Sequence, residues 1–376
     1  MNRQHRIAVS AFFFLTGFGF ASWASRIPDI STRLKLNSAQ LGGVLFALPV
    51  GLLASLPLAG WLVAKYGSRV VMISAGIFYP LLLPLIGMVY ETWHLVVLLI
   101  FFGFGGNLLN ISMNTQAIGV EALYRRSIMA SFHGVWSMAG FTGAAIGTFM
   151  ISKNILPLYH FLIISAACLV IVMIAYRFAL PKDLPRTEAQ PIFAMPDKSL
   201  LNLGIIAFCC MICEGAMFDW SGIYFQKVVR AEKGYFAAGY TAFMMTMATG
   251  RFVGDWLVTK FGTKTILQAS GITIATGLFI SVAFPYFYSA IAGFLLVGAG
   301  VSSVVPLVYS NAGKSKRMSS GVALAAVSTI GYLGFLFGPP VIGFIAEATS
   351  LRVSFVLIAI LGLTTTIVST VTTIEK

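Results

Sequence analysis

Residues 61–69 read WLVAKYGSR, and nearly the same nine residues return 195 positions later as WLVTKFGTK at 256–264. Five of the nine positions are identical, and the other four exchange similar side chains, such as Tyr66 for Phe261. Recurrence at a fixed spacing is the signature of an internal duplication. The sequence therefore consists of two related halves.

A second pair of segments repeats at nearly the same spacing. Each has two basic residues ahead of a stripe of Ser, Gly and aromatic residues. Because both copies of both motifs carry basic residues beside an apolar segment, we expect them on one side of a membrane. This predicts parallel repeats with an even number of crossings in each. The copies, 191 positions apart, are Arg125, Arg126, Ser137, Gly140, Phe141 and Gly143, and Lys316, Arg317, Ser328, Gly331, Tyr332 and Gly334.

The composition excludes a soluble protein, since 58% of the 376 residues are hydrophobic and only 10% are charged. The sequence predicts an all-α integral membrane protein with 12 transmembrane helices in two pseudo-symmetric six-helix bundles, 1–178 and 200–376, joined by a cytoplasmic linker at 179–199. The linker contains four prolines and six charged residues. The apolar runs, each of about 20 residues and long enough to span a bilayer, are 7–25, 38–63, 70–90, 93–119, 127–151, 157–178, 200–226, 236–259, 265–284, 287–310, 320–345 and 352–373.

The net charge of +13 is spread over short loops instead of lining one basic face, so we expect no nucleic-acid partner. Sixteen Lys and Arg residues fall on the side of the N-terminus and seven on the other, which predicts that both termini are cytoplasmic. The first apolar run begins like a secretory signal, but eleven more follow, so we expect it to be retained.

The chain shows no pattern typical of an enzyme or a metal site. We find no nucleophile beside a base and no phosphate-binding loop. Cys209, Cys210 and Cys213 share one apolar run with no second cysteine pair and no histidine close by, so we interpret them as buried apolar side chains. We predict no catalytic residues, no metal and no cofactor.

Glu214 is the most informative titratable residue because it lies near the centre of the run at 200–226. An ionised carboxylate at that depth costs at least about 2.5 kcal/mol, so it is protonated, paired or facing water. A carboxyl that gains and loses a proton there suits a proton-coupled carrier. Asp219 lies about 140° further round the helix, so an unbroken helix cannot direct both carboxylates into one cavity. Asp219 therefore has either a proton-coupling or a structural role. A break of the helix at Gly215 or Gly222 would allow both carboxylates to face the cavity.

Several other residues are candidates for contact with a solute or a proton. Asn107, Asn110 and Asn114 fall within an arc of about 60° on one helix and form either interhelical hydrogen bonds or solute contacts. His133, Trp136 and Ser137 share one stripe, in which His133 is a proton carrier or a structural residue. Arg26 either pairs with Asp29 or binds an anion. Stacking contacts are expected from Trp23, Trp136 and Trp220.

Four charged residues are expected to act in gating at the cytoplasmic side. Lys65 and Arg69 belong to the repeated motif. Arg251 and Asp255 are opposite charges four positions apart, which predicts a local ion pair near a helix end.

The chain resembles the major facilitator superfamily, whose loop motif reads Gly, three residues, Asp, Arg, any residue, Gly, Arg, Arg. Here it corresponds to Gly60, Ala64, Lys65, Gly67, Ser68 and Arg69, and the aspartate is replaced at Ala64. The segments SRIPD at 25–29 and EGAMFDWS at 214–221 resemble more narrowly a bacterial inner-membrane branch related to the fucose and hexose proton symporters. This resemblance implies the fold of that superfamily, alternating access, a proton gradient as energy source and a bacterial inner-membrane location.

We therefore predict a proton-coupled secondary transporter that moves a small polar solute through a cavity between the halves, as a monomer in the lipid bilayer. Import of a sugar-like solute is preferred. The first alternative is proton-antiport export of drugs or metabolites, which the 31 Phe and 15 Met residues favour. The second, from another class, is a membrane sensor or scaffold that has lost transport.

Overall fold

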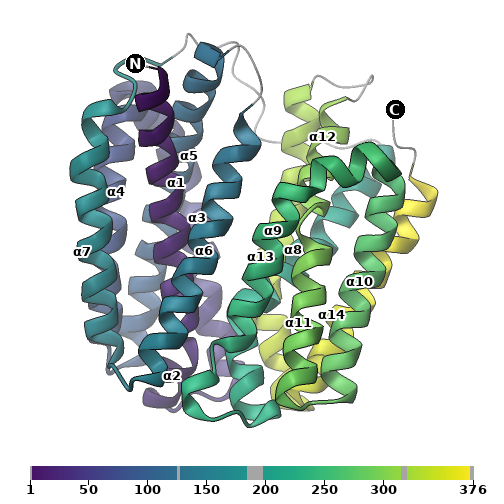
Figure 1. The fold of residues 1–376 in the computed structure, drawn as a ribbon. Coiled ribbons are helices and arrows are strands. Elements are labelled where there is room, and N and C mark those ends of the chain that lie inside the picture. Colours follow the sequence, from purple (N-terminus) through teal and green to yellow (C-terminus); the bar gives the residue numbers. More distant parts are fainter. Residues whose placement is uncertain (1, 125–127, 184–197, 315–319, 373–376) are drawn as a thin grey trace. The chain divides into compact units, whose positions relative to one another are not determined.

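The computed structural model describes residues 2–124, 128–183, 198–314 and 320–372, which are mainly helical (Figure 1). The contacts divide the chain into two compact units. Unit 1 comprises Met1–Pro185 with Glu232–Ala237, and unit 2 comprises Arg186–Ala231 with Ala238–Lys376. The predicted linker at 179–199 lies mostly outside the described residues.

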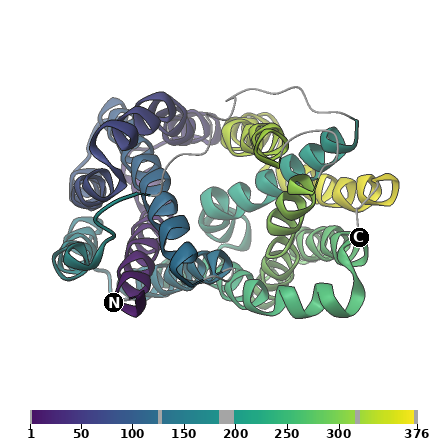
Figure 2. The same ribbon diagram turned by 90° about the horizontal axis from the view of Figure 1, so that it is seen from above.

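The described residues of unit 1 form six long α-helices and a short one that follows the first of them, and Figure 2 views them along their length. His5 Nδ1 lies 2.7 Å from the carbonyl oxygen of Phe178, so the start of the unit and the chain after its last helix lie at one end. An even number of crossings produces this arrangement. The helices are α1 (Asn2–Ser25), α2 (Ile27–Arg33), α3 (Ser38–Tyr66), α4 (Ser68–Gly87), α5 (Thr92–Tyr124), α6 (Met129–Ser152) and α7 (Pro157–Ala175).

The described residues of unit 2 form seven α-helices, because the run expected at 287–310 is divided in two at Ser302 and Ser303. α9 approaches this break closely, since a Cβ on Gly250 would collide with the side chain of Ser302. The break is therefore part of the packing against α9. The helices are α8 (Lys198–Tyr224), α9 (Ala238–Phe261), α10 (Thr263–Ala283), α11 (Phe287–Val301), α12 (Val304–Gly313), α13 (Ser320–Ala348) and α14 (Leu351–Val371).

The described part of the chain contains 11 helices that are long and apolar enough to cross a membrane. Each of the twelve predicted runs corresponds to a helical segment, so the all-α prediction is confirmed. α9 is the segment missing from the eleven, although it has 24 residues. It carries Arg251, Asp255 and Lys260, and these charges lower its apolar character.

The repeated nine-residue motif folds in the same way in both units. Each copy ends one helix and begins the next through a glycine, Gly67 with φ 83° and ψ 151° and Gly262 with φ 80° and ψ 152°. Such a conformation is open almost exclusively to glycine. The preceding lysines also match, since the Lys65 Nζ lies 4.6 Å from the centroid of the Trp61 ring and the Lys260 Nζ 5.1 Å from that of Trp256.

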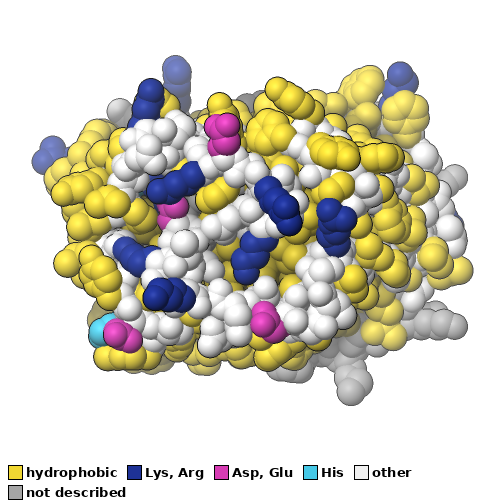
Figure 3. Space-filling model, turned by 90° about the horizontal axis from the view of Figure 1, so that it is seen from below, with side chains coloured by type: hydrophobic (Ala, Val, Ile, Leu, Met, Phe, Trp, Pro, Cys, Tyr) yellow, Lys and Arg dark blue, Asp and Glu magenta, His cyan; other side chains and the backbone are white. Residues whose placement is uncertain are grey.

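Large apolar side chains are exposed along the helices of both units, as expected for surfaces that contact lipid. Phe149 in unit 1 and Phe344 in unit 2 are 56% and 62% exposed. Figure 3 looks onto one end face of the molecule, where basic side chains are scattered among acidic and polar groups. The charges on that face therefore do not form one continuous basic patch.

Candidate functional site

The central feature of unit 2 is an ion pair between α8 and α9. Arg251 Nη2 lies 3.4 Å from Glu214 Oε1. The Glu214 side chain is 7% exposed and that of Arg251 16%, so the pair is largely buried without being sealed. The structure thus places Glu214 in the second of its predicted alternatives, a carboxylate with a cationic partner.

The position of Arg251 differs from the sequence interpretation, which placed it near a helix end. In the structure Arg251 lies ten residues before Phe261, where α9 ends, which is about 15 Å along the helix axis. A guanidinium at that depth needs a partner, and Glu214 supplies one. The side chain of Asp255, the predicted partner, lies outside the described residues. The gating role of Arg251 and Asp255 stays a prediction.

Aromatic and sulfur-bearing side chains surround Glu214. Tyr309 from α12, Tyr332 from α13 and Cys210 from the preceding turn of α8 all lie within electrostatic reach of its carboxylate. A Cβ on Gly215 would stand 3.0 Å from the Phe335 ring of α13, so a small residue next to Glu214 allows α13 to approach. The carboxylate of α8 is therefore paired with α9 and has ionisable neighbours on α12 and α13 of the same unit.

Asp219 is half-buried, and no described residue forms a hydrogen bond with its carboxylate. The Tyr240 hydroxyl lies within electrostatic reach of both Asp219 and Glu214. Tyr240 is 1% exposed, and its hydroxyl also has no hydrogen-bond partner among the described residues. Buried polar groups are nearly always bonded, so the Tyr240 hydroxyl is a candidate contact for a polar solute.

The structure answers the question whether α8 breaks between its two carboxylates. The α-helix is continuous from Lys198 to Tyr224 and continues into a π-helical turn at Phe225–Val229. Gly215 and Gly222 therefore do not interrupt it. Cys209, Cys210 and Cys213 are buried free thiols, and no group of three metal-ligating side chains occurs among the described residues.

The predicted amide face of α5 in unit 1 has two different environments. Asn107 is 5% exposed, and its amide donates to the Ser55 hydroxyl at 2.7 Å and to the Leu52 carbonyl at 3.2 Å, joining α5 to α3. The amide of Asn114 donates to the Asn110 side chain at 2.9 Å within α5. Asn107 therefore forms the interhelical bonds of the structural alternative, whereas Asn110 and Asn114 remain half-buried candidates for solute contact.

Two of the three tryptophans are fully enclosed within their units. Trp23 is 1% exposed and Trp220 is fully buried, and neither indole N–H has a hydrogen-bond partner among the described residues. Enclosed rings offer no face for a solute to stack on. The predicted stacking role gains no support from the burial of these two residues.

The stripe on α6 places three candidates in different environments. His133 is exposed and its ring stands edge-on to that of Phe13 at 5.3 Å between centroids, while Trp136 is half-buried. The buried Ser137 donates its hydroxyl to the His133 carbonyl at 3.1 Å. The hydroxyl of Ser137 is thus used within the helix.

Arg26 forms a buried clasp at the junction of α1 and α2. Its guanidinium donates to Asp29 at 2.6 Å, to His160 Nδ1 at 3.1 Å and to the Ile155 carbonyl at 2.9 Å. Burial lowers the pKa of Arg26, and the hydrogen bond and charge of Asp29 counteract the effect. The local pair proposed from the sequence is present, with added partners from α7 and the chain before it.

The gating candidates of unit 1 lie beside a carboxylate that the sequence interpretation did not assign. Asp183 accepts hydrogen bonds from the backbone N–H of Ser68 at 2.7 Å and from the Ser68 hydroxyl, at the first turn of α4. The motif lacks its aspartate at Ala64, and Asp183, from the segment that follows α7 in the sequence, supplies a carboxylate to this loop. Arg69 donates to the Tyr176 carbonyl at 3.2 Å, close to the same segment.

Sequence comparison gives one family. The model of the Major Facilitator Superfamily matches residues 7–320 and 240–374. An uncharacterised MFS-type transporter of Yersinia pestis is 33% identical over 365 residues, covering 96% of this chain and 94% of the relative. The membrane protein MosC of Rhizobium meliloti is 31% identical over 359 residues, covering 94% of this chain and 87% of the relative.

Solved transporter structures share the fold over nearly the whole chain. The nucleoside transporter NupG has a TM-score of 0.74 at 13% identity, covering 98% of this chain and 99% of its own. FucP in the outward conformation has a TM-score of 0.68 at 17% identity and 98% coverage of both chains. A bacterial homologue of the human lysosomal transporter Spinster has a TM-score of 0.74 at 15% identity, covering 99% and 97%. At these identities the likeness shows the fold alone.

Proposed function

We propose that this chain, which belongs to the major facilitator superfamily and transports a solute across a membrane, couples that transport to protons through Glu214. The observation that carries the proposal is the pairing of Glu214 with Arg251 inside unit 2. Glu214 is the protonation site and Arg251 is the cation that stabilises its charged form. The solute is a small polar molecule, and the membrane is the bacterial inner membrane with both termini in the cytoplasm.

The pair supports proton coupling because it links a charge state to a contact between two helices. Two charges deep in the apolar interior are costly, and their attraction offsets the cost only while both are charged. When Glu214 takes up a proton, the attraction to Arg251 is lost. Protonation therefore weakens the contact between α8 and α9, which is a physical means of linking a proton to a change of conformation.

The geometry favours a pair that can open. Charge-assisted hydrogen bonds are usually about 2.7–2.9 Å long, whereas Glu214 and Arg251 are 3.4 Å apart and both side chains retain some exposure. A tightly closed, fully buried pair would hold its charges permanently. The longer, partly exposed pair is compatible with proton exchange.

A polar solute is supported by side chains with unused or adaptable hydrogen-bonding capacity. In unit 2 these are the Asp219 carboxylate and the Tyr240 hydroxyl, and in unit 1 they are the half-buried amides of Asn110 and Asn114. A site for apolar drugs in either unit would not need such polar groups. The import of a sugar-like solute is therefore preferred over drug export. Export by proton antiport would use the same residues, with the solute and the proton moving in opposite directions.

The test is solute-driven proton flux in proteoliposomes that enclose a pH-sensitive dye. L-fucose and uridine are suitable first probes, followed by a panel of small polar metabolites. Glu214→Gln removes the protonation site, and Glu91→Gln is the matched control because Glu91 is an exposed residue between α4 and α5 that also loses one carboxylate. We expect flux for wild type and the control and its loss in Glu214→Gln. Equal flux in Glu214→Gln would remove Glu214 from the mechanism, and the absence of flux with every solute would favour the sensor.

A further inference from the structure

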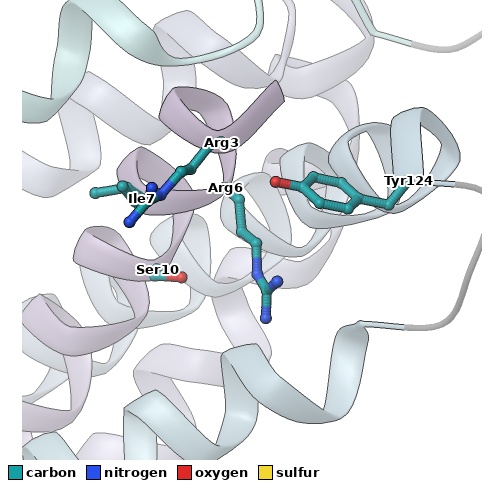
Figure 4. Close-up of a pocket in the computed structure, with 5 residues that line it drawn as sticks. All are labelled: Arg3, Arg6, Ile7, Ser10 and Tyr124. Carbon is teal, nitrogen blue, oxygen red and sulfur yellow. The ribbon is translucent and has the colours of Figure 1, made fainter. Parts of the chain in front are cut away.

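A cavity of about 410 Å³ opens at the end of unit 1 where α1 begins. Arg3, Arg6, Ile7 and Ser10 line it from α1, and Tyr124 lines it from the last residue of α5 (Figure 4). The four α1 positions follow the spacing i, i+3, i+4 and i+7, so they share one face of that helix. One helix face and one aromatic side chain therefore build the cavity.

The cavity concentrates positive charge that the described residues do not neutralise. Arg3 and Arg6 are three positions apart on a helix, a spacing at which like charges repel. No described residue forms an ion pair with either guanidinium. The acidic side chains at this end of the unit are used elsewhere, since Glu121 accepts from the backbone N–H groups of Ile128 and Met129, and Asp183 is bound to Ser68.

Arg6 is held in place while Arg3 is left at the rim. The Arg6 guanidinium donates to the Ser131 hydroxyl at 3.2 Å and lies 5.6 Å from the centroid of the Tyr124 ring. Figure 4 shows the Tyr124 side chain reaching from α5 toward Arg6. Arg3 is exposed and has no hydrogen-bond partner among the described residues. A group bound here would meet one fixed and one adaptable guanidinium, an arrangement that suits a phosphate.

The apolar part of the cavity distinguishes a lipid from a free ion. Ile7 lies directly after Arg6 and is 58% exposed, although most of α1 is buried. A free phosphate has no use for an exposed apolar side chain, whereas an acyl chain leaving a headgroup would cover it. Basic pockets between transmembrane helices are known sites for anionic headgroups.

We propose that this cavity binds the phosphate of an anionic phospholipid, with Arg3 and Arg6 on the phosphate and Ile7 against the start of an acyl chain. The site is separate from Glu214 and does not depend on proton coupling. Its occupation would hold α1 against α5 and α6 at the membrane surface.

The experiment measures lipid retention by native mass spectrometry and thermal protection in neutral detergent. The probes are phosphatidylglycerol, phosphatidylcholine and inorganic phosphate. The test variant is Arg3→Gln with Arg6→Gln. The matched control is Lys35→Gln with Lys153→Gln, which removes two exposed positive charges from other loops of unit 1. Arg3→Gln alone is a second test variant, since Arg3 makes no hydrogen bond with any described residue.

We expect wild type to retain phosphatidylglycerol over phosphatidylcholine. The affinity should fall about tenfold or more in the double arginine variant, fall partly in Arg3→Gln and stay unchanged in the lysine control. Ile7→Ser should weaken the binding of phosphatidylglycerol and leave the binding of inorganic phosphate unchanged. Protection by inorganic phosphate that equals protection by phosphatidylglycerol and is unchanged in Ile7→Ser would overturn the assignment to a lipid. Equal retention of both lipids, or the same loss in the lysine control as in the arginine variants, would overturn the proposal.

Discussion

Arg251 on α9 lies 3.4 Å from Glu214 on α8, and this pair joins two helices of unit 2 through opposite charges inside their apolar packing. Arg251 is one of the three charged residues that make α9 less apolar than the other helices. A helix that carries a charge at mid-depth is tolerated because its neighbour carries the opposite one.

The pair predicts strong coupling between substitutions at its two positions. Glu214→Gln or Arg251→Gln alone leaves one charged group without its partner, so each should lower the free energy of unfolding by about 3 kcal/mol. The double variant should lose less than the sum, with a coupling energy of about 1–3 kcal/mol. Unfolding by SDS in mixed micelles measures all four proteins. Additive losses would show that the two side chains act independently.

Removing the hydroxyl group should change the stability differently at two buried tyrosines of unit 2. The Tyr224 hydroxyl donates to the Ser281 carbonyl at 2.8 Å, so Tyr224→Phe should cost about 1 kcal/mol of stability. The Tyr240 hydroxyl has no partner among the described residues, so Tyr240→Phe should leave the stability without solute unchanged or raise it. Once a transported solute is known, Tyr240→Phe should raise its KM and Tyr224→Phe should not. A stability loss in Tyr240→Phe as large as that in Tyr224→Phe would mean that its hydroxyl is already bonded.

The elements of the fold were predictable because each depends on residues close together in sequence. Apolar runs of bilayer length predict the helices, and the nine-residue repeat at 61–69 and 256–264 predicts two related halves. That Glu214 needs a partner was also predictable, since an acidic residue in an apolar run is costly wherever its partner lies. Its role in proton coupling stays a prediction.

Contacts between helices were not predictable, because one sequence shows only local partners. Asp255, four positions after Arg251, offered a local pair that concealed the contact with Glu214, 37 positions away. The amide face of α5 was identified from the spacing of its asparagines. The hydrogen bond of Asn107 to Ser55 spans 52 positions, and no feature of the sequence indicated it. The same holds for His160, which meets Arg26 across 134 positions.

The clasp around Arg26 predicts a structural effect in unit 1. Arg26→Gln leaves Asp29 without its cation and should lower the free energy of unfolding by about 3 kcal/mol. Arg26→Lys should restore only part of it, because an ammonium cannot reach Asp29, His160 and the Ile155 carbonyl with the geometry of a guanidinium. Denaturant titration measures the loss, and transport kinetics provide the second readout. A raised KM with unchanged stability would support the alternative in which Arg26 binds an anionic solute.

The repeated turn predicts equal effects in the two units. Gly67 and Gly262 have φ of 83° and 80° with extended ψ, so Gly67→Ala and Gly262→Ala should each cost about 1–3 kcal/mol of stability through backbone strain. Gly60→Ala is the matched control, since Gly60 lies within α3 and a Cβ there meets no atom within 4 Å. Alanine at that helical position should be neutral or stabilising. Thermal unfolding of the three variants measures the contrast, and a loss in only one of the two turns would show that the duplicated motif no longer has the same structural role in both units.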